Sequence, residues 1–339
     1  MDVGEVLSFL GSRLELEVPI GPMTTYRVGG RARWFVEVVD HRELGRIAAA
    51  LAAVSDATTP PPPILVVGRG SNLLVADHGF EGLVIRLGES FATVDVDDTT
   101  VSAGAAASLP VVARRTVAAG LTGFEWAVGV PGSIGGAVRM NAGGHGADMA
   151  ASLHSIRFVD VDSGEDGEMS VDELDLGYRA SSVRAAQVVT EATLSLAHGS
   201  VDTGQVELSE IVAWRRENQP GGQNAGSVFA NPPDDSAGRL IDVAGCRGLR
   251  IGSVHVSTKH ANFFQADAGG SADDVFALMV EVARKVRDRF GIDLRPETRM
   301  IGFRDFADAV ASGDTEPSDD TEPSDDTEPS GDSDNEASP

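Results

Sequence analysis

The chain has 339 residues, 42% of them hydrophobic, with 52 acidic and 27 basic side chains and a formal net charge of −25. This length suggests about two to three domains, and the apolar content is sufficient for a buried core, so neither a single small module nor a wholly disordered chain is expected. The strong negative charge argues against a nucleic-acid partner, because it repels phosphate backbones.

Metal and membrane signals are missing from the sequence. Cys246 is the only cysteine, which excludes intramolecular disulfides and cysteine-clustered zinc sites. The seven histidines show no metal-ligand spacing, so no metal is predicted. No run approaches the roughly 18 apolar residues of a membrane span, and the first residues lack the basic start of a secretory signal. These features predict a cytoplasmic protein without a membrane partner.

Arginine dominates the basic residues, because Lys259 and Lys285 are the only lysines. An acidic, lysine-poor body suits very high salt, where the Debye length falls to about 3 Å at 1 M and like charges no longer repel one another. We therefore predict a halophilic protein. Part of the acidic excess lies in the tail, where the Thr-Glu-Pro-Ser-Asp-Asp of 315–320 recurs at 321–326, and this segment is expected to be disordered.

The first part of the chain predicts strands and helices in alternation. A short amphipathic helix opens the chain, and residues 34–39 have the composition of a strand. Asp40 and Glu43 form a capping box before an apolar helical face, which predicts a helix beginning there. The apolar run 64–67 and residues 83–87 indicate two further strands.

The pattern continues in the rest of the chain. Ser108 caps a predicted helix that ends at Gly120, and strands are expected near 153–161 and 187–196. The elements expected after residue 200 are a helix near 206–217, a short helix from Ser236 to Gly245, and a helix beginning at Ser271 whose apolar stripe ends at Gly291. This last α/β unit is expected to end near Phe303.

Two segments are rich in glycine. One is Gly68-Arg69-Gly70-Ser71-Asn72-Leu73, after an apolar strand, and the other is 129–144, with six glycines. Backbone N–H groups approach a phosphate closely only where no Cβ intervenes, so both segments predict phosphate or pyrophosphate binding. For the first segment alone, an ordinary turn is an equal alternative. Leu73 breaks the dinucleotide fingerprint and no P-loop motif occurs, which argues against a nicotinamide Rossmann domain and a P-loop NTPase.

Three polar residues are candidates for catalysis. Ser227 follows Gly226, Arg179 follows Tyr178, and Glu297 lies in Arg-Pro-Glu-Thr-Arg. Ser227 lacks the Gly-x-Ser-x-Gly elbow, so hydrolase chemistry is not indicated. Taken singly, each residue has an ordinary structural explanation.

Several motifs occur in one order along the chain: Thr25 to Gly30, Gly68 to Val75, Gly123 to Glu125, Gly129 to Gly132, Tyr178 to Ser181, Gly226 to Pro232, His260 to Phe263 and Pro296 to Gly302. With these motifs the sequence resembles the UDP-N-acetylenolpyruvoylglucosamine reductase family, flavoenzymes that complete UDP-N-acetylmuramate in peptidoglycan precursor synthesis. The similarity runs from about Thr25 to Gly302, which is most of the chain before the acidic tail.

The resemblance implies an α+β or α/β fold with a vanillyl-alcohol-oxidase-like (PCMH-type) FAD-binding domain of two subdomains and a C-terminal α/β substrate-binding domain. On this reading, residues 1–86 and 87–200 form the two FAD-binding subdomains. Residues 201–305 form the substrate domain, and 306–339 form a disordered acidic repeat tail.

The resemblance also implies the ligands and their binding residues. FAD is the cofactor, NADPH is the reductant, and the substrate is the enolpyruvyl ether of a UDP-sugar. The implied FAD-binding residues are Arg27, Gly29, Gly30, Gly68, Arg69, Gly70, Ser71, Asn72, Leu73, Gly129, Pro131, Gly132, Ser133, Gly135, Gly136 and Asn141. The implied substrate-binding residues are Tyr178, Asn231, Lys259 and His260.

The implied reaction reduces UDP-N-acetyl-3-O-(1-carboxyvinyl)-glucosamine to UDP-N-acetylmuramate, with hydride from flavin N5. Ser227 corresponds to the family's proton donor. Arg179 would stabilise negative charge that develops on the substrate, and Glu297 would position or polarise the substrate carboxylate. The product serves cell wall biogenesis and, through it, cell shape and division.

Two other functions stay open at this point. One is a flavoprotein of the same superfamily that acts on a different small molecule. The other is a non-catalytic flavin or nucleotide binder, because many salt-requiring microbes are archaea without peptidoglycan. A monomer is expected.

Overall fold

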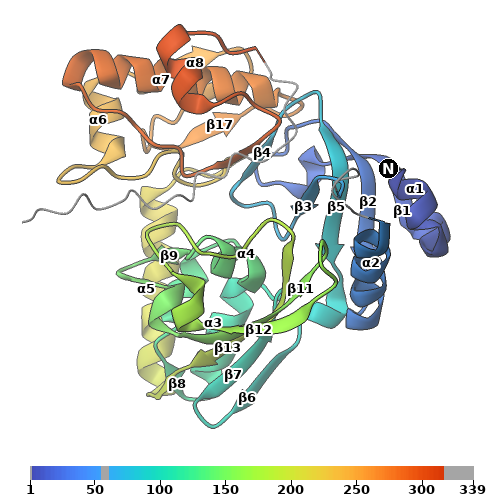
Figure 1. Ribbon diagram of the computed structural model, residues 1–339. Helices are drawn as coiled ribbons and strands as arrows, with labels where there is room; N and C mark the ends of the chain where they lie inside the picture. The colour runs from blue at the N-terminus through green and yellow to red at the C-terminus, as the bar shows by residue number, and fades with distance from the viewer. Residues whose placement is uncertain (1, 55–60, 317–339) are drawn as a thin grey trace, which may run out of the picture.

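The computed structural model describes residues 2–54 and 61–316. In Figure 1 a blue N-terminal sheet and a green second sheet lie side by side, and an orange-red C-terminal part lies above them. The acidic repeats from residue 317 onward lie outside the described residues, so their expected disorder stays a prediction. Within the described residues, no helix combines the length and the apolar content that crossing a membrane requires.

The first sheet consists, in spatial order, of β1 (Leu14–Pro19), β2 (Arg31–Val38), β5 (Phe80–Leu87) and β3 (Ile64–Val66). β1 is antiparallel to β2, whereas β2 and β3 both run parallel to β5. The helix His41–Val54 (α2) covers this sheet and begins after Asp40 as predicted, but of the expected capping box only the bond to the Asp40 side chain is formed, because the return bond to Glu43 comes from Val39 and not from Asp40. The Glu43 N–H donates to Asp40 Oδ1 at 2.8 Å, and the Val39 N–H donates to Glu43 Oε2 at 2.9 Å.

The second sheet is antiparallel and consists, in spatial order, of β12 (Asp166–Ser170), β11 (Leu153–Asp160), β13 (Gln187–Ser195), β7 (Thr100–Gly104) and β6 (Val94–Asp97). The helices of this part are α3 (Leu109–Ala118), α4 (Ile134–Arg139) and α5 (Val201–Asn218). Its two short strand pairs are β8 (Leu121–Thr122) with β14 (Ala197–His198), and β9 (Gly143–Gly144) with β10 (Ala147–Asp148).

Short helical segments connect these elements and open the chain. They are α1 (Val3–Val6), η1 (Ser8–Arg13), η2 (Gly21–Met23), η3 (Glu89–Phe91), η4 (Glu125–Gly129), η5 (Met149–Ala151) and η6 (Val171–Leu174). A short helix therefore opens the chain as predicted, and Val3 together with the C-cap residue Leu7 is buried in the first sheet's core.

Helix α5, the long yellow helix of Figure 1, reaches from the second sheet toward the C-terminal part. Its buried residues Leu208 and Ile211 belong to the apolar cluster of the second sheet. A boundary at residue 200 would separate these side chains from the core that buries them. The packing therefore favours a domain boundary near Asn218, where α5 ends. It does not support the predicted boundary at residue 200.

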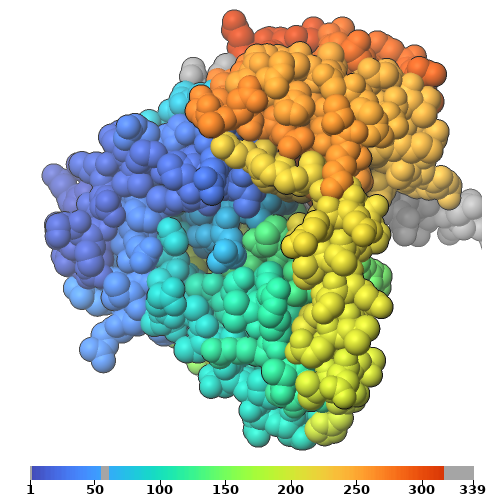
Figure 2. Space-filling view, turned by 180° about the vertical axis from the view of Figure 1, so that it is seen from behind, coloured from blue at the N-terminus to red at the C-terminus, as the bar shows by residue number. Residues whose placement is uncertain are grey.

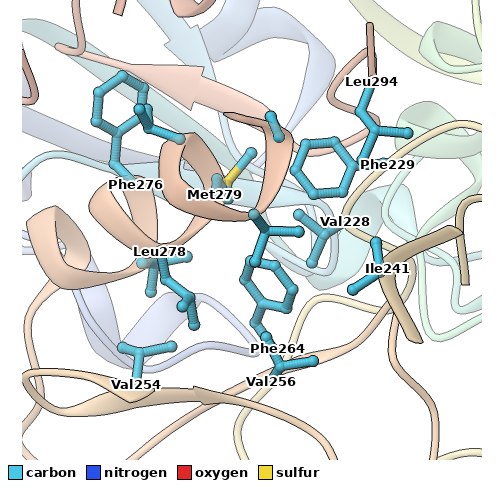
Figure 3. Packing of buried hydrophobic residues seen from close by; sticks show 14 of the residues in the cluster. Val228, Phe229, Ile241, Val254, Val256, Phe264, Phe276, Leu278, Met279 and Leu294 are labelled. Atoms are coloured by element: carbon cyan, nitrogen blue, oxygen red, sulfur yellow. The ribbon is translucent and has the colours of Figure 1, made fainter. Parts of the chain in front are cut away.

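The C-terminal core is organised around α7 (Ala272–Phe290), which begins and ends as predicted. The Asp274 N–H donates to the Ser271 hydroxyl at the first turn, and Gly291 closes the last turn in the left-handed region with φ 67°. Figure 3 shows Phe229, Phe264 and Phe276 pointing into this core. The other elements are α6 (Ala237–Val243), β15 (Arg250–Ile251), β16 (Val254–Val256) and β17 (Phe264–Ala266).

A further helix, α8 (Phe306–Ser312), follows the predicted end of the domain. Phe306, Ala309 and Val310 are buried in the C-terminal core, and α8 packs on α7. The expectation that the domain ends at 305 and that disorder begins at 306 is therefore wrong for this segment. The acidic residues around the helix obscured three apolar positions at i, i+3 and i+4, which is the spacing of a helical face.

A strand pair and a helix start are among the contacts that join the C-terminal part to the chain around the first sheet. β4 (Leu73–Val75) pairs in parallel with β18 (Arg299–Ile301), with Leu73 opposite Arg299 and Val75 opposite Ile301. The Asp77 carboxylate accepts hydrogen bonds from the Ser271 hydroxyl and from the Ala272 N–H at the start of α7. The first glycine-rich segment therefore leads directly into a strand that is shared with the C-terminal part.

Candidate active site

A cavity of ≈ 500 Å³ lies where the two sheets and the C-terminal part meet. Its size is in the range of about 300–1,000 Å³ that small-molecule sites occupy. Figure 2 shows an indentation of the surface where the blue, teal and yellow segments meet. The predicted residues that line the cavity are Gly68, Arg69, Gly70, Ser71, Asn72, Leu73, Gly129, Pro131, Gly132, Ser133, Gly135, Gly136, Arg179, Ser227 and Glu297.

The loop 68–72 connects β3 to β4 and forms one wall of the cavity. A Cβ on Gly68 would lie 2.3 Å from Ser133 Oγ, and one on Gly70 would lie 2.3 Å from the Met23 carbonyl oxygen. Gly70 also has φ 58°, which favours glycine. These close approaches explain why glycine occupies both positions. Without side chains there, backbone N–H groups lie near the cavity, which is the arrangement that phosphate binding needs.

The loop 129–136 forms the facing wall and touches the first loop through Ser133. The Ser133 hydroxyl accepts a hydrogen bond from the Gly136 N–H at 3.4 Å, which caps α4. The Gly132 carbonyl accepts from the Leu109 N–H at 3.1 Å, and the Gly135 N–H donates to the Ala105 carbonyl at 2.9 Å. The second sheet's elements thus hold this loop against the loop from the first sheet.

Arg179 and Glu297 form an ion pair in the cavity wall, although 118 residues separate them. Arg179 Nε donates to Glu297 Oε1 at 2.5 Å, and the two side chains are 23% and 15% exposed. Arg179 Nη2 also donates to the Gly143 carbonyl at 3.1 Å. Its φ of 59° is unusual for a non-glycine residue, and such backbone strain clusters at functional sites.

Ser227 lies in the same cavity and is linked to Glu297 through the neighbouring backbone. The Glu297 N–H donates to the Val228 carbonyl at 2.8 Å, and Phe229 forms an isolated bridge with Pro296. Gly226, before the serine, has φ 81°, and its N–H donates to Asn224 Oδ1 at 3.1 Å. The structure therefore brings a hydroxyl, a guanidinium and a carboxyl group to one cavity from three distant segments.

Asn141 is buried next to this cluster but, in the part of the chain described, is not part of the cavity lining. Its Nδ2 donates to the Gly177 carbonyl at 2.8 Å and to Asp148 Oδ2 at 3.2 Å, and its Oδ1 accepts from the Ala150 N–H at 3.0 Å. These bonds tie the segment that carries Arg179 to the second glycine-rich loop. The contacts thus give Asn141 a part in holding the loops, and its direct cofactor contact stays a prediction.

Three other predicted cofactor residues, Arg27, Gly29 and Gly30, do not line the cavity within the described residues. A Cβ on Gly29 would lie 2.6 Å from the Val75 carbonyl oxygen, and one on Gly30 would lie 2.4 Å from that of Asp77. These glycines are required by the close packing of two chain segments. Arg27 is exposed, and its N–H donates to the Thr24 hydroxyl.

The four predicted substrate residues also lie outside the cavity lining in the described part of the chain, so their role stays a prediction. Tyr178 is 54% exposed, and its ring contacts the Arg179 guanidinium. Asn231 Oδ1 accepts from the N–H at the start of α6, and Lys259 Nζ donates to a carbonyl on α5 at 2.6 Å. Burial, and secondarily Arg247, lowers the pKa of His260.

The cavity has more arginines than the sequence indicated. Within the described residues, its lining includes Arg69, Arg86, Arg139, Arg179, Arg184, Arg215 and Arg299 against the carboxyl groups of Glu37, Glu89 and Glu297. Arg215 Nε donates to Gln219 Oε1 at 2.7 Å, and burial lowers its pKa. No sequence signal separates these arginines from the others of the chain. Their grouping in a protein of net charge −25 favours an anionic ligand.

Family models match both halves of the chain. Residues 43–168 match the model described as FAD binding domain, and residues 218–301 match the model described as UDP-N-acetylenolpyruvoylglucosamine reductase, C-terminal domain. The second match begins where α5 ends, which agrees with the division near Asn218. Together with the solved relative below, these matches confirm the expected fold class.

The relatives agree with one another. The chain is 41% identical over 304 residues, 89% of this chain and 96% of the relative, to the UDP-N-acetylenolpyruvoylglucosamine reductase of Paramagnetospirillum magneticum. It is 40% identical to that of Acidiphilium cryptum over 86% of this chain and 92% of the relative. The crystal structure of UDP-N-acetylenolpyruvylglucosamine reductase from Thermus caldophilus has a TM-score of 0.72 and 35% identity, covering 85% of this chain and 98% of that one. The chain therefore belongs to the UDP-N-acetylenolpyruvoylglucosamine reductase family.

Proposed function

We propose that this protein reduces UDP-N-acetyl-3-O-(1-carboxyvinyl)-glucosamine to UDP-N-acetylmuramate, with FAD as cofactor and NADPH as reductant. The observation that carries the proposal is the meeting of Ser227, Arg179 and Glu297 in one cavity, beside a loop whose Gly68 and Gly70 approach neighbouring segments too closely for a Cβ atom. Family membership supports the same reaction.

The residues present fit an FAD molecule. The loops 68–72 and 129–136 face each other across a cavity of ≈ 500 Å³, and a side chain at Gly68 or Gly70 would collide with the opposite or adjoining segment. The arginines of the lining suit a pyrophosphate. When bound, the flavin supplies the hydride of the reaction. The chain's own part is to hold the substrate, balance its charge and deliver a proton.

Arg179 carries the electrostatic part of this mechanism. The pair with Glu297 and the bond to the Gly143 carbonyl hold the guanidinium in place before substrate arrives. A fixed cation stabilises charge that develops in the transition state without reorganisation at that moment. Arg179 would therefore stabilise the enolate-like charge on the substrate, and Glu297 would set the orientation of the guanidinium and of the substrate carboxylate.

Ser227 completes the reaction as proton donor. A serine hydroxyl has a high pKa, so it suits donation to a strongly basic carbanion and would not suit a weaker base. The hydroxyl lies on the loop between Gly226 and Val228, and the Val228 carbonyl is bonded to the Glu297 N–H. The proton donor and the carboxyl group are therefore held at adjoining positions of the cavity wall.

The test follows the colour of the purified protein. It should be yellow, NADPH should bleach it without oxygen, and the enolpyruvyl substrate should restore the colour. Bleaching without restoration would favour a flavoprotein that acts on another small molecule. A colourless protein that takes up no added FAD would contradict the proposal and favour a non-catalytic binder.

The cellular setting belongs to the same proposal. The reaction places the protein in the cytoplasm, in peptidoglycan synthesis and hence in cell wall biogenesis, cell shape, cell cycle and cell division. The net charge of −25 supports a halophilic protein without a nucleic-acid partner, and we also propose a monomer without a membrane partner. Sedimentation and activity measured from low to molar KCl test these statements.

A further inference from the structure

Glu297 lies at a point where distant segments of the chain meet, and both of its backbone groups are used there. Its N–H donates to the Val228 carbonyl at 2.8 Å, beside Ser227. Its carbonyl accepts from Asn72 Nδ2 at 2.8 Å, across 225 residues of sequence. The side chain pairs with Arg179. Hydrogen bonds to two other parts of the chain thus fix the backbone of Glu297, and the pair with Arg179 fixes its carboxyl group.

Asn72 is the partner that comes from the first glycine-rich loop. Its own carbonyl accepts from the Arg299 N–H at 3.0 Å, and the pairing of β4 with β18 begins at the next residue, Leu73. The backbone and the side chain of Asn72 therefore both bind the segment 297–299. A displacement of the loop moves the Glu297 backbone with it, because the two segments share this pair of bonds.

Asn72 also lines the main cavity. One amide N–H is committed to Glu297, whereas in the part of the chain described Oδ1 has no hydrogen-bond partner. The same amide is therefore able to accept from a ligand group and donate to the Glu297 carbonyl. We propose that Asn72 is a positioning residue, which couples the cofactor loop to Glu297 so that the seated loop fixes the carboxyl group against Arg179. This inference rests on the function proposed above.

The proposal depends on the donor character of the amide. An aspartate of the same shape is ionised near neutral pH and has only acceptors, so it would repel the Glu297 carbonyl instead of binding it. An alanine would leave that carbonyl without this donor. Asn72→Asp and Asn72→Ala therefore remove the hydrogen bond to Glu297 in two different ways. If Asn72→Asp folds poorly, Asn72→Ala still tests the proposal.

The experiment measures the two half-reactions separately, with each protein saturated with FAD and the flavin absorbance followed without oxygen. Both variants should be bleached by NADPH at close to the wild-type rate. Restoration of the colour by the enolpyruvyl substrate should slow by up to about 10²-fold, the cost of small misplacements of catalytic groups. A split between the half-reactions is expected because Glu297 acts on the substrate and not on NADPH.

Two control variants separate positioning from other causes. Asn218→Asp changes an amide that also donates to a backbone carbonyl at 2.8 Å but lies outside the cavity lining, and both of its half-reactions should match wild type. Ser71→Ala changes the neighbouring cavity residue, which has no hydrogen bond to Glu297 among the described residues, and should lower FAD affinity without splitting the half-reactions.

The outcomes are distinct. Equal losses in both half-reactions of Asn72→Asp, or a loss of FAD affinity alone, would overturn the coupling and make Asn72 an ordinary cofactor residue. Wild-type behaviour of both Asn72 variants would also overturn it. If NADPH does not bleach the wild-type protein, the proposed function itself is contradicted, independently of Asn72.

Discussion

The core around α7 and the junction around Glu297 lie in the same part of the molecule but are held by different interactions. The core consists mainly of buried apolar side chains between residues 225 and 310, such as Phe264 and Phe276, both fully buried. The junction consists of hydrogen bonds and an ion pair between residues 118 and 225 positions apart. Stability and chemistry are therefore carried by different side chains of this region, although the core residue Val228 lends its backbone carbonyl to the junction.

This separation has a physical reason. Apolar burial is not directional, so a core tolerates many arrangements that fill the same volume. The junction requires donors and acceptors at fixed distances. A small displacement there therefore lowers turnover more than it lowers the free energy of unfolding. Changes in the junction should therefore act on turnover, and changes in the core should act on the free energy of unfolding.

The largest effect is expected for Ser227→Ala, which removes the proposed proton donor. The rate of colour restoration by substrate should fall by roughly 10²- to 10⁴-fold, the usual contribution of general acid catalysis. Bleaching by NADPH and the urea midpoint of unfolding should stay near wild type. Ser209→Ala, on the exposed face of α5, is the matched control. A similar loss in both half-reactions of Ser227→Ala would contradict its role.

The next effect is expected in the core. Phe264 is fully buried and its ring lies 6.1 Å from that of Phe229. Phe264→Ala should reduce the free energy of unfolding by about 3–5 kcal/mol, because it removes a large side chain and leaves a cavity. Urea unfolding followed by circular dichroism measures this, with Leu16→Ala, 64% exposed, as the control. A loss of unfolding free energy no larger than that of Leu16→Ala would contradict the assignment of stability to this core.

A smaller effect is expected where the two domains touch at the start of α7. Asp77 accepts hydrogen bonds there from the Ser271 hydroxyl, the Ala272 N–H and the Asp273 N–H. Asp77→Ala should cost about 1 kcal/mol of unfolding free energy, the usual loss for a helix cap. Asp77→Asn keeps one of the two acceptor oxygens and places an amide donor at the other, so its loss should be smaller than that of Asp77→Ala. Equal losses of unfolding free energy in the two variants would show that the hydrogen bonds accepted by Asp77 do not cause the destabilisation.

The smallest effect concerns the pH dependence of stability. Burial, and then Arg247, lowers the pKa of His260, so the folded state binds this proton less readily than the unfolded state. Stability should therefore decrease as the pH falls through the ordinary histidine value of about 6.5, where the unfolded chain begins to take up the proton. His260→Gln should show a weaker decrease in unfolding titrations over the same range. If stability changed with pH as steeply in His260→Gln as in wild type, His260 would not contribute to this pH dependence.

Much of the fold could be predicted from local patterns. The Asp40 side-chain cap at the start of α2, and α7 between Ser271 and Gly291, are confirmed because their signals lie within a few residues of the structures they specify. The site was partly predictable, since Ser227, Arg179 and Glu297 do meet in one cavity. Their meeting was inferred from a family resemblance, and no local pattern of this chain contains it.

What the sequence alone determined, then, is where most of the long helices and strands lie and where the glycines interrupt them, because periodicity, caps and turns act over one or two turns of chain. The tertiary structure decided the rest. It placed Gly29 and Gly30 against another segment instead of the cavity, brought Arg215 into the lining, and buried α8 under α7. These outcomes depend on which surfaces pack together, and packing brings into contact residues that lie far apart in the sequence.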